Sequence, residues 1–201
     1  MMTRPFALAL AAVAIAACSN DGSTAPERPP AELNILRLDP NHPPFEQTTV
    51  SFWARVNQSR EAKIYFQNGQ GGRGEEFARL KIDSGSLLAR PDGSAFGTND
   101  SILITMSVVD PSRVLVELQP AGLRFRSDKP AELKLEYGEA DEDYDDDGDI
   151  DGDDDSVEQK FAIWRQEKAG DPYVQLGSVK FEDAREIEAK LVSFSRYAIA
   201  Y

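Results

Sequence analysis

The sequence predicts an all-β protein, an antiparallel β-sandwich that carries one long acidic loop. Apolar and polar residues alternate with a period of two in many short segments, as they do in strands that bury one face. Turn-forming pairs such as Asn68-Gly69 and Asp110-Pro111 separate these segments. The one stretch whose spacing also suits a helix, residues 184–191, alternates equally well as a strand, and we assign it as a strand. Many short strands at turn-marked intervals are typical of antiparallel sandwiches.

Alternation is clearest in residues 50–56, 102–108, 114–118 and 133–137. In the last of these segments the apolar side chains of Leu133 and Leu135 alternate with charged neighbours, which predicts one face on a core and one face in water. Weaker alternation predicts further strands in residues 33–38, 61–67, 77–82, 160–165, 173–176, 179–182 and 195–201.

The N-terminus has the proportions of a signal peptide over residues 1–17. Arg4 precedes an apolar run of twelve residues, which is shorter than the roughly 18 residues that a transmembrane helix needs. The run ends Ile-Ala-Ala-Cys, and Cys18 is the only cysteine in the chain. This ending resembles the lipobox of bacterial lipoproteins, in which the cysteine is lipidated and becomes the first mature residue. Ordinary cleavage that leaves a free Cys18 is the alternative.

The lipoprotein resemblance implies an exported protein held on a bacterial membrane by lipid at Cys18. Ser19 after the cysteine is compatible with the outer membrane or the cell surface. Residues 18–32 have three prolines among Ser, Gly, Thr and Asn and predict a flexible tether, so one domain is expected over residues 33–201. The strong acidity of the chain argues against nucleic acid as a partner, because such binding needs clustered Lys or Arg.

Four segments of the C-terminal part of the chain follow one another in a recognisable order: residues 77–82 (FARLKI), 120–125 (PAGLRF), 130–137 (PAELKLEY) and 194–197 (FSRY). Together they resemble the ZU5 domain, the β-sandwich module of ankyrins and netrin receptors. The resemblance covers about residues 77–201 and implies an interaction or scaffold module that has no substrate pocket. Residues 33–76 lie outside it and are expected to add strands to the same sandwich.

All of the excess negative charge lies in an acidic segment, residues 138–158. The chain has a net charge of −13, and this segment holds thirteen acidic residues without any Lys or Arg, so the acids elsewhere balance the basic residues. The ZU5-like part is therefore expected to carry the segment as an insertion between two strands.

The acidic segment contains the spacing of an EF-hand-type calcium loop, similar to the loops of dockerins. In a first register, position 1 is Asp143, the sharp turn at position 6 is Gly148, and an apolar residue, Ile150, is at position 8. Asp149 offers its backbone carbonyl at position 7, and position 12 has Asp154 where Glu is usual. The predicted metal ligands are Asp143, Asp145, Asp147, Asp149, Asp151 and Asp154.

A second register overlaps the first and starts at Asp147. It places Gly152 at the turn and the usual glutamate, Glu158, at position 12, but it has Asp154 at position 8, where an apolar residue is expected. Because the two registers share three aspartates, we expect one calcium ion and favour the first register. Magnesium fits less well, since it takes few carboxylates and keeps its waters. The competing interpretation is a solvated, disordered acidic run.

Enzymatic chemistry has little support in the sequence. Residues 69–74 satisfy G-x-G-x-x-G, but a strand rather than a helix is expected to follow, which the dinucleotide fingerprint does not allow. His42 is the only histidine and lies in a Pro-rich loop. Some ZU5 domains cleave themselves at a His-Phe-Ser motif; here Ser193 precedes Phe194-Ser195, so the base is missing and no self-cleavage is expected.

The sequence therefore predicts a membrane-anchored, calcium-binding, non-enzymatic interaction or structural module of the bacterial cell envelope. Its partner is expected to be another envelope protein or a glycan, and no small-molecule cofactor is expected. The alternatives are a carbohydrate-binding envelope protein, which exposure of both Trp164 and Tyr173 on one face would favour, and a hydrolase with its site on the sandwich face.

Overall fold

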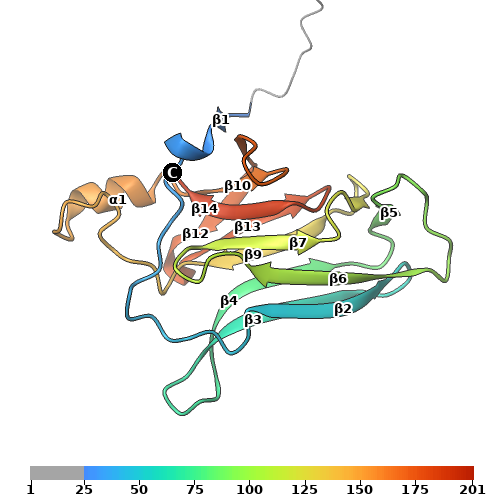
Figure 1. Ribbon diagram of the computed structural model, residues 1–201, viewed down its shortest axis with the longest axis horizontal. Helices are drawn as coiled ribbons and strands as arrows, with labels where there is room; N and C mark the ends of the chain where they lie inside the picture. The colour runs from blue at the N-terminus through green and yellow to red at the C-terminus, as the bar shows by residue number, and fades with distance from the viewer. Residues whose placement is uncertain (1–24) are drawn as a thin grey trace, which may run out of the picture.

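The computed structural model describes residues 25–201, in which two large antiparallel sheets pack face to face (Figure 1). The predicted all-β sandwich is thus confirmed. The predicted signal peptide and the lipid attachment residue Cys18 lie outside the described residues. Among residues 25–201, no helix has the length and apolar character needed to cross a membrane.

The seven-stranded sheet has the order β1-β11-β10-β14-β7-β6-β2, so strands from both ends of the chain lie in it. Its central pairing joins β14 to β10 through register pairs such as Ile163 with Ile199. In the order of the sheet, the strands are β1 (Glu27–Arg28), β11 (Tyr173–Gln175), β10 (Ala162–Gln166), β14 (Arg196–Ala200), β7 (Leu115–Gln119), β6 (Ser101–Val108) and β2 (Thr49–Arg55).

The five-stranded sheet has the order β12-β13-β9-β4-β3, and a small third sheet pairs β5 with β8. Residues 184–191 hold the strand β13, as predicted, preceded by a 3-10 turn (η2, Glu182–Ala184). The strands are β12 (Ser178–Phe181), β13 (Glu186–Leu191), β9 (Ala131–Glu136), β4 (Arg73–Ile82), β3 (Arg60–Gln67), β5 (Leu87–Ala89) and β8 (Arg124–Phe125).

The main hydrophobic core fills the space between the two large sheets. Alternate residues of each strand face it, for example Ile104 and Val116 from the seven-stranded sheet and Leu80 and Leu133 from the five-stranded sheet, all fully buried. This is the period-two pattern that predicts the strands, because successive side chains of a strand point to opposite faces. The rigid sandwich fixes the positions of the loops at its two ends.

A second, smaller core lies on the outer face of the seven-stranded sheet. There Leu33 packs with Trp164 and Tyr173, beneath the segment that leads into the domain. Residues 33–38, predicted as a strand, make isolated bridges instead, such as Ile35 with Ala200. Leu36 donates to the carbonyl of Ile199 (3.0 Å) and accepts from the amide of Val114 (2.9 Å). The segment thus passes from the end of β14 to residues 112–114, and no continuous ladder forms.

Part of the expected tether is docked on the sandwich. Within residues 25–32, β1 pairs with β11, and a 3-10 turn follows (η1, Pro30–Glu32). The carbonyl of Pro26 accepts a hydrogen bond from the amide of Gln175 (2.9 Å), and the guanidinium of Arg28 lies 5.9 Å from the centre of the Trp164 ring. The edge of β11 offers unpaired backbone groups, and pairing them outweighs the flexibility that the composition predicts.

Candidate metal site

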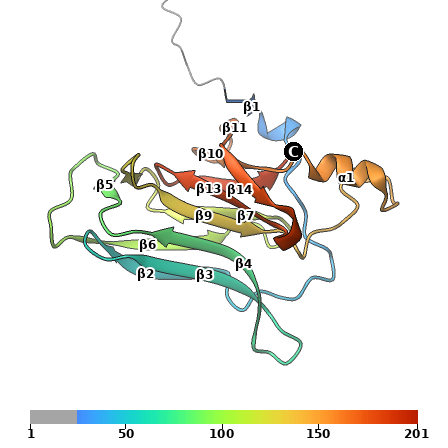
Figure 2. The ribbon, with the colours of Figure 1, turned by 180° about the vertical axis from the view of Figure 1, so that it is seen from behind.

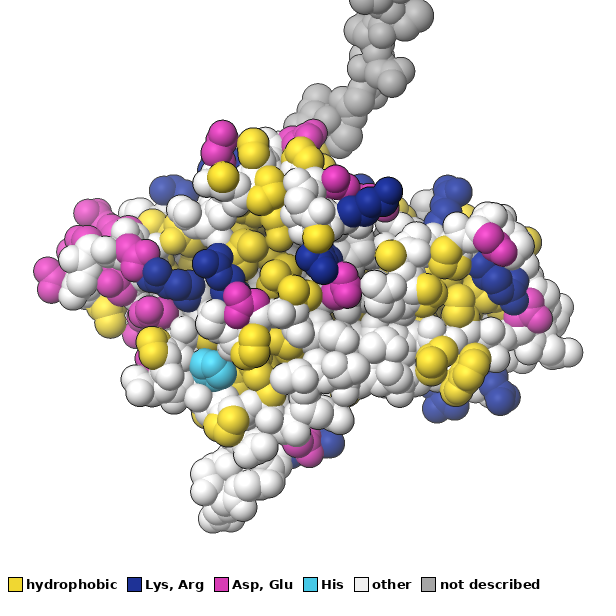
Figure 3. Space-filling view, viewed as in Figure 1, with side chains coloured by type: hydrophobic (Ala, Val, Ile, Leu, Met, Phe, Trp, Pro, Cys, Tyr) yellow, Lys and Arg dark blue, Asp and Glu magenta, His cyan; other side chains and the backbone are white. Residues whose placement is uncertain are grey.

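The acidic segment connects β9 to β10, which belong to different sheets. It is therefore not a hairpin extension between neighbouring strands, as the expected insertion would be, but a crossover at one end of the sandwich. Acidic side chains gather at this end, where the short helix α1 (Gly152–Glu158) projects (Figures 1 and 3). The sequence did not predict this helix.

The entry to the segment is fixed by backbone pairing with residues 37–39. Leu38 and Ala140 form an isolated antiparallel bridge. On either side of it, the amide of Asp39 donates to the carbonyl of Glu139 (3.0 Å) and the amide of Asp141 donates to the carbonyl of Arg37 (3.1 Å). These bonds hold the acidic segment against the sandwich just before its first aspartate ligand.

Tyr144 docks the acidic segment into the protein interior. Its side chain is buried, and its ring meets the edge of Phe161 with 4.9 Å between centres. The guanidinium of Arg185 donates to the Tyr144 hydroxyl (2.8 Å), and the hydroxyl of Tyr201 donates to the Tyr144 carbonyl. A buried tyrosine with a bonded hydroxyl is a strong anchor, because the ring leaves water without losing a polar partner. The segment is thus ordered on the sandwich and does not hang free.

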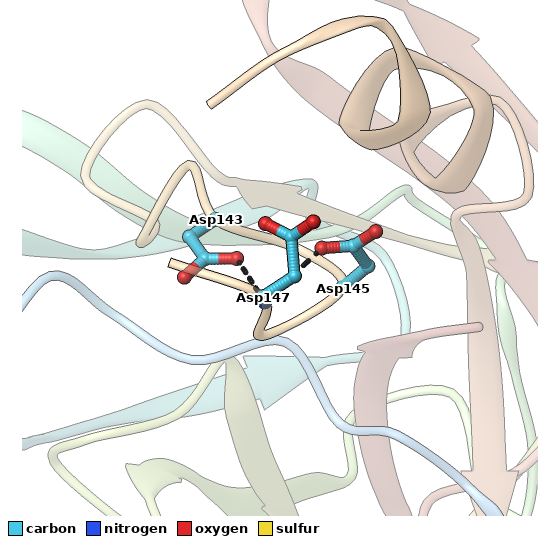
Figure 4. A group of neighbouring side chains, drawn as sticks. All are labelled: Asp143, Asp145 and Asp147. Carbon is cyan, nitrogen blue, oxygen red and sulfur yellow. Dashed lines mark hydrogen bonds between the residues drawn. The ribbon is translucent and has the colours of Figure 1, made fainter. Parts of the chain in front are cut away.

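Asp143, Asp145 and Asp147 converge at the start of the loop (Figure 4). One carboxylate oxygen from each lies within 4.8 Å of the others. The amide of Asp147 donates to one oxygen of Asp143 (3.1 Å) and to Asp145 (3.3 Å), and the amide of Gly148 donates to the other Asp143 oxygen (3.0 Å). The chain folds around the first carboxylate, which orients the three side chains toward one point.

The sharp turn needs two residues in the left-handed region. Gly148 has a φ of +92°, which a glycine adopts without steric cost. Asp146 has a φ of +67°, and its carboxylate receives two hydrogen bonds from the guanidinium of Arg37, one of them 2.8 Å long. This ion pair lowers the pKa of Asp146 and offsets its charge.

The buried carboxylate of Asp154 links the two ends of the loop. Asp154 is only 3% exposed, and its carboxylate accepts hydrogen bonds from the amide of Tyr144 (2.6 Å) on one oxygen and from the amide of Asp151 (2.8 Å) on the other. The carboxylate of Asp151 in turn accepts from the amide of Asp153 (2.8 Å), which completes a capping box at the start of α1. Asp154 thereby ties the second position of the loop to the helix.

Three of the six predicted ligands come together, and three do not. Asp143, Asp145 and Asp147 form the cluster, whereas Asp151 and Asp154 bond to backbone amides, and no contact is found for the carboxylate of Asp149 among residues 25–201. The cluster could hold a metal ion. Asp154, predicted as the ligand at position 12, lies outside this cluster and accepts the amides of Tyr144 and Asp151 on its two oxygens.

The geometry agrees with the first register and not with the second. Gly148 makes the sharp turn, whereas Gly152 opens the helix. Glu158, which the second register needs as a ligand, accepts a hydrogen bond from the Tyr137 hydroxyl (2.8 Å) on the inner side of the segment. Ile150, the apolar residue at position 8 of the first register, is 68% exposed.

The titration of the site reflects this arrangement. Partial desolvation, followed by the charges of Asp147, Asp154 and Asp143, raises the pKa of Asp145. Hydrogen bonds from backbone amides, that of Asp151 first, lower the pKa of Asp154. Asp145 therefore takes up a proton more readily than an ordinary aspartate, while Asp154 stays ionised as the acceptor of the loop amides.

The other sequence features lie outside the site. Residues 69–74 span the turn between β3 and β4 and the first two residues of β4, so the glycine motif precedes a strand and not a helix. Trp164 and Tyr173 are each 3% exposed and offer no platform for a sugar, whereas Trp53 is 58% exposed. His42 packs against the rings of Phe45 and Phe66.

Arg37, Tyr144 and Arg185 shape the site, and the sequence analysis assigned none of them a role. Tyr144 is the one aromatic residue in the acidic segment, and that isolation is the signal that could have found it. Comparison of the chain with protein-family models, with curated proteins and with solved structures finds no match.

Proposed function

We propose that the protein is a calcium-binding, non-enzymatic interaction or structural module, anchored to a membrane of the bacterial cell envelope. The observation that carries this proposal is the convergence of Asp143, Asp145 and Asp147 around a turn whose glycine and following helix stand where an EF-hand-type loop places them. The helix begins at Gly152, which is position 10 of the first register.

Calcium is the cation that suits this donor set. The cluster offers several carboxylate oxygens on a short loop, and calcium accepts six to eight oxygens in adaptable geometry. The carbonyl of Asp149 and solvent would complete the shell. Extracellular calcium modules work with dissociation constants of about 10⁻⁴–10⁻³ M, which an exposed site with few fixed ligands matches.

The envelope location rests on the sequence, because Cys18 and the apolar run lie outside the described residues. Lipid on Cys18 would hold the domain at a membrane, since each buried methylene contributes about 0.8 kcal/mol. Residues 25–32 dock on the seven-stranded sheet, so the tether would comprise residues 18–24. The resemblance to ZU5 domains supports a role in binding another envelope component.

Calcium is expected to raise the melting temperature of residues 19–201. An ion that binds only the folded form stabilises it by mass action, by about 2.7 kcal/mol at 100 times the dissociation constant. For a domain of this size that free energy corresponds to a rise of about 5–10 °C. Thermal unfolding followed by circular dichroism, with calcium or with a chelator, measures the rise.

The matched variant for this measurement is Asp145→Asn with Asp147→Asn, which removes two charges and keeps the shape of the side chains. It is expected to melt normally in chelator and to lose the calcium-dependent rise. A double change of the same type outside the cluster, Asp153→Asn with Asp155→Asn, controls for the lower net charge. Equal rises in both variants would contradict the assignment of the site.

The calcium-dependent rise in melting temperature is expected to shrink as the pH falls, starting at a pH above the ordinary pKa of aspartate. Calcium needs ionised ligands, and the raised pKa of Asp145 means that protons compete above the ordinary aspartate value of about 4. Without calcium, Asp145 is expected to make the protein more stable as the pH falls, because a carboxyl group with a raised pKa favours the folded state as it is protonated. Melting curves between pH 7 and pH 4.5 test this; a rise that stays constant over that range would show that Asp145 is not a ligand.

A further inference from the structure

The strand β2 presents a free edge of the seven-stranded sheet along the lower margin of the molecule (Figures 1 and 2). The amide of Val108 donates to the carbonyl of Thr48 (2.8 Å), and β2 then pairs with β6 in unbroken register. In an antiparallel pair, bonded and non-bonded positions alternate. Thr49, Ser51, Trp53 and Arg55 therefore direct their backbone N–H and C=O groups away from β6.

The other edges of the two large sheets are short or covered. At the far edge of the seven-stranded sheet, β1 has two residues, and in the five-stranded sheet β12 has four. The remaining edge, β3, contains register shifts, and residues 44–46 cover part of it through hydrogen bonds from Glu46 to Tyr65 (2.9 Å) and from Gln67 to Pro44 (2.7 Å). Among residues 25–201, β2 is the long edge that lacks these protections, which proteins otherwise use against strand pairing.

An exposed apolar pair lies beside this edge. Trp53 is 58% exposed and stands opposite Leu103 on β6, which is 45% exposed. Both side chains lie on the outer face of the sheet, because their neighbours Phe52 and Ile104 pack with the main core. A strand added to β2 would place alternate side chains next to Trp53, as cross-strand neighbours are placed within a sheet.

The edge is also locally positive in a chain of net charge −13. Arg55 and Arg60 line one surface hollow with Phe52, Trp53 and Ser101. No carboxylate in residues 25–201 forms an ion pair with Arg55 or Arg60, and β2 itself contains no acidic residue. The charge at this edge is therefore complementary to an acidic chain, whereas a second copy of β2 would bring no acid to it.

We propose that the β2 edge is a docking site for an extended acidic peptide of another protein, which binds as an eighth strand of the seven-stranded sheet. Backbone hydrogen bonds to the free edge supply affinity, and pockets and charges for alternate side chains supply selectivity. This proposal rests on the interaction-module part of the proposed function and does not involve the metal site.

The probe is a blocked heptapeptide of alternating glutamate and valine, labelled for fluorescence anisotropy, with calcium chelated so that the metal site does not contribute. It is expected to bind at least about tenfold more tightly than the same peptide with lysine for glutamate, and to weaken as salt is added. Methylation of one alternate set of peptide amides is expected to weaken binding at least about tenfold, and methylation of the other set less than about twofold, because only one set faces β2.

Two protein variants place the site. Ser51→Pro removes an outward N–H and blocks an incoming strand without removing a bond to β6. It is expected to weaken peptide binding at least about tenfold. The control, Ser51→Thr, is expected to leave peptide binding unchanged. Arg55→Glu with Arg60→Glu is expected to reverse the preference to the lysine peptide. The methylated peptides test the same point on the unaltered protein, so a variant that folds poorly does not decide the outcome.

Several results would overturn the proposal. The glutamate peptide could fail to bind at concentrations up to about 1 mM. The two methylation patterns could weaken binding equally. The peptide could bind a folded Ser51→Pro variant as tightly as the unaltered protein. Sedimentation that shows a dimer lost in Ser51→Pro would assign the edge to a second copy of the chain instead.

Discussion

Replacing Tyr144 with alanine is expected to lower the free energy of unfolding by about 3 kcal/mol. Truncation of a buried aromatic side chain costs about 3–5 kcal/mol, and we take the lower end because the ring lies near the surface end of the core. The change removes the contact with Phe161 and leaves Arg185 without its hydroxyl acceptor. Urea unfolding followed by tryptophan fluorescence measures the difference.

The same variant is expected to weaken calcium binding by about 10- to 100-fold, the usual effect of losing a residue that holds metal ligands in position without binding the metal itself. Tyr144 stands between the proposed ligands Asp143 and Asp145, and its amide bonds to Asp154. Tyr144→Phe is the matched control, because it keeps the ring and loses only the hydroxyl contact, at a cost of about 1 kcal/mol. If Tyr144→Ala binds calcium as tightly as the unaltered protein, the calcium site forms without docking of the Tyr144 side chain in the protein interior.

Replacing Lys134 with methionine is expected to lower the free energy of unfolding by about 2 kcal/mol. Lys134 lies on the outer face of the five-stranded sheet, yet it is only 9% exposed. Its ammonium contacts the carboxylates of Glu76 (2.9 Å), Glu136 (2.5 Å) and Glu186 (2.8 Å), one each from β4, β9 and β13. Burial works against its charge, but the three carboxylates together raise its pKa.

Without Lys134 three neighbouring carboxylates lose their shared partner. Breaking a fully buried pair costs about 3–5 kcal/mol, and partial solvation of these carboxylates reduces that figure. The loss is expected to shrink from pH 7 to pH 4, because repulsion among the carboxylates raises their pKa in the folded variant and favours folding as they are protonated. Lys190→Met is the control, since Lys190 pairs with Glu132 on the same face but its side chain is 63% exposed. Equal losses in the two variants would contradict the central role of Lys134.

The sandwich could be predicted because alternation in a half-buried strand reflects burial directly. Leu133 and Leu135 face the core while Lys134 and Glu136 do not, as their spacing predicts. What the spacing could not predict is that Lys134 is nearly buried on the outer face. That burial depends on acidic residues from β4 and β13, and no local pattern records which strands become neighbours.

The convergence of Asp143, Asp145 and Asp147 could be predicted from the sequence, but the role of Asp154 at position 12 could not. Position in a loop motif marks Asp154 as a ligand, whereas its spacing from Asp151 also matches a capping box, the signal of a helix start. The strand-rich surroundings favoured a strand after the acidic segment, so the helix α1 was missed. Docking of the segment through Arg37 and Arg185 depends on residues more than 40 positions away in sequence, beyond the reach of a local motif.

Calorimetric titration of residues 19–201 with calcium at pH 7 is the measurement that tests the metal site most directly. We expect heat that fits one ion per chain with a dissociation constant of about 10⁻⁴–10⁻³ M or tighter, and no such heat for Asp145→Asn with Asp147→Asn. Heat indistinguishable from dilution into buffer for the unaltered protein would contradict calcium binding and leave the cluster of Asp143, Asp145 and Asp147 as a solvated turn.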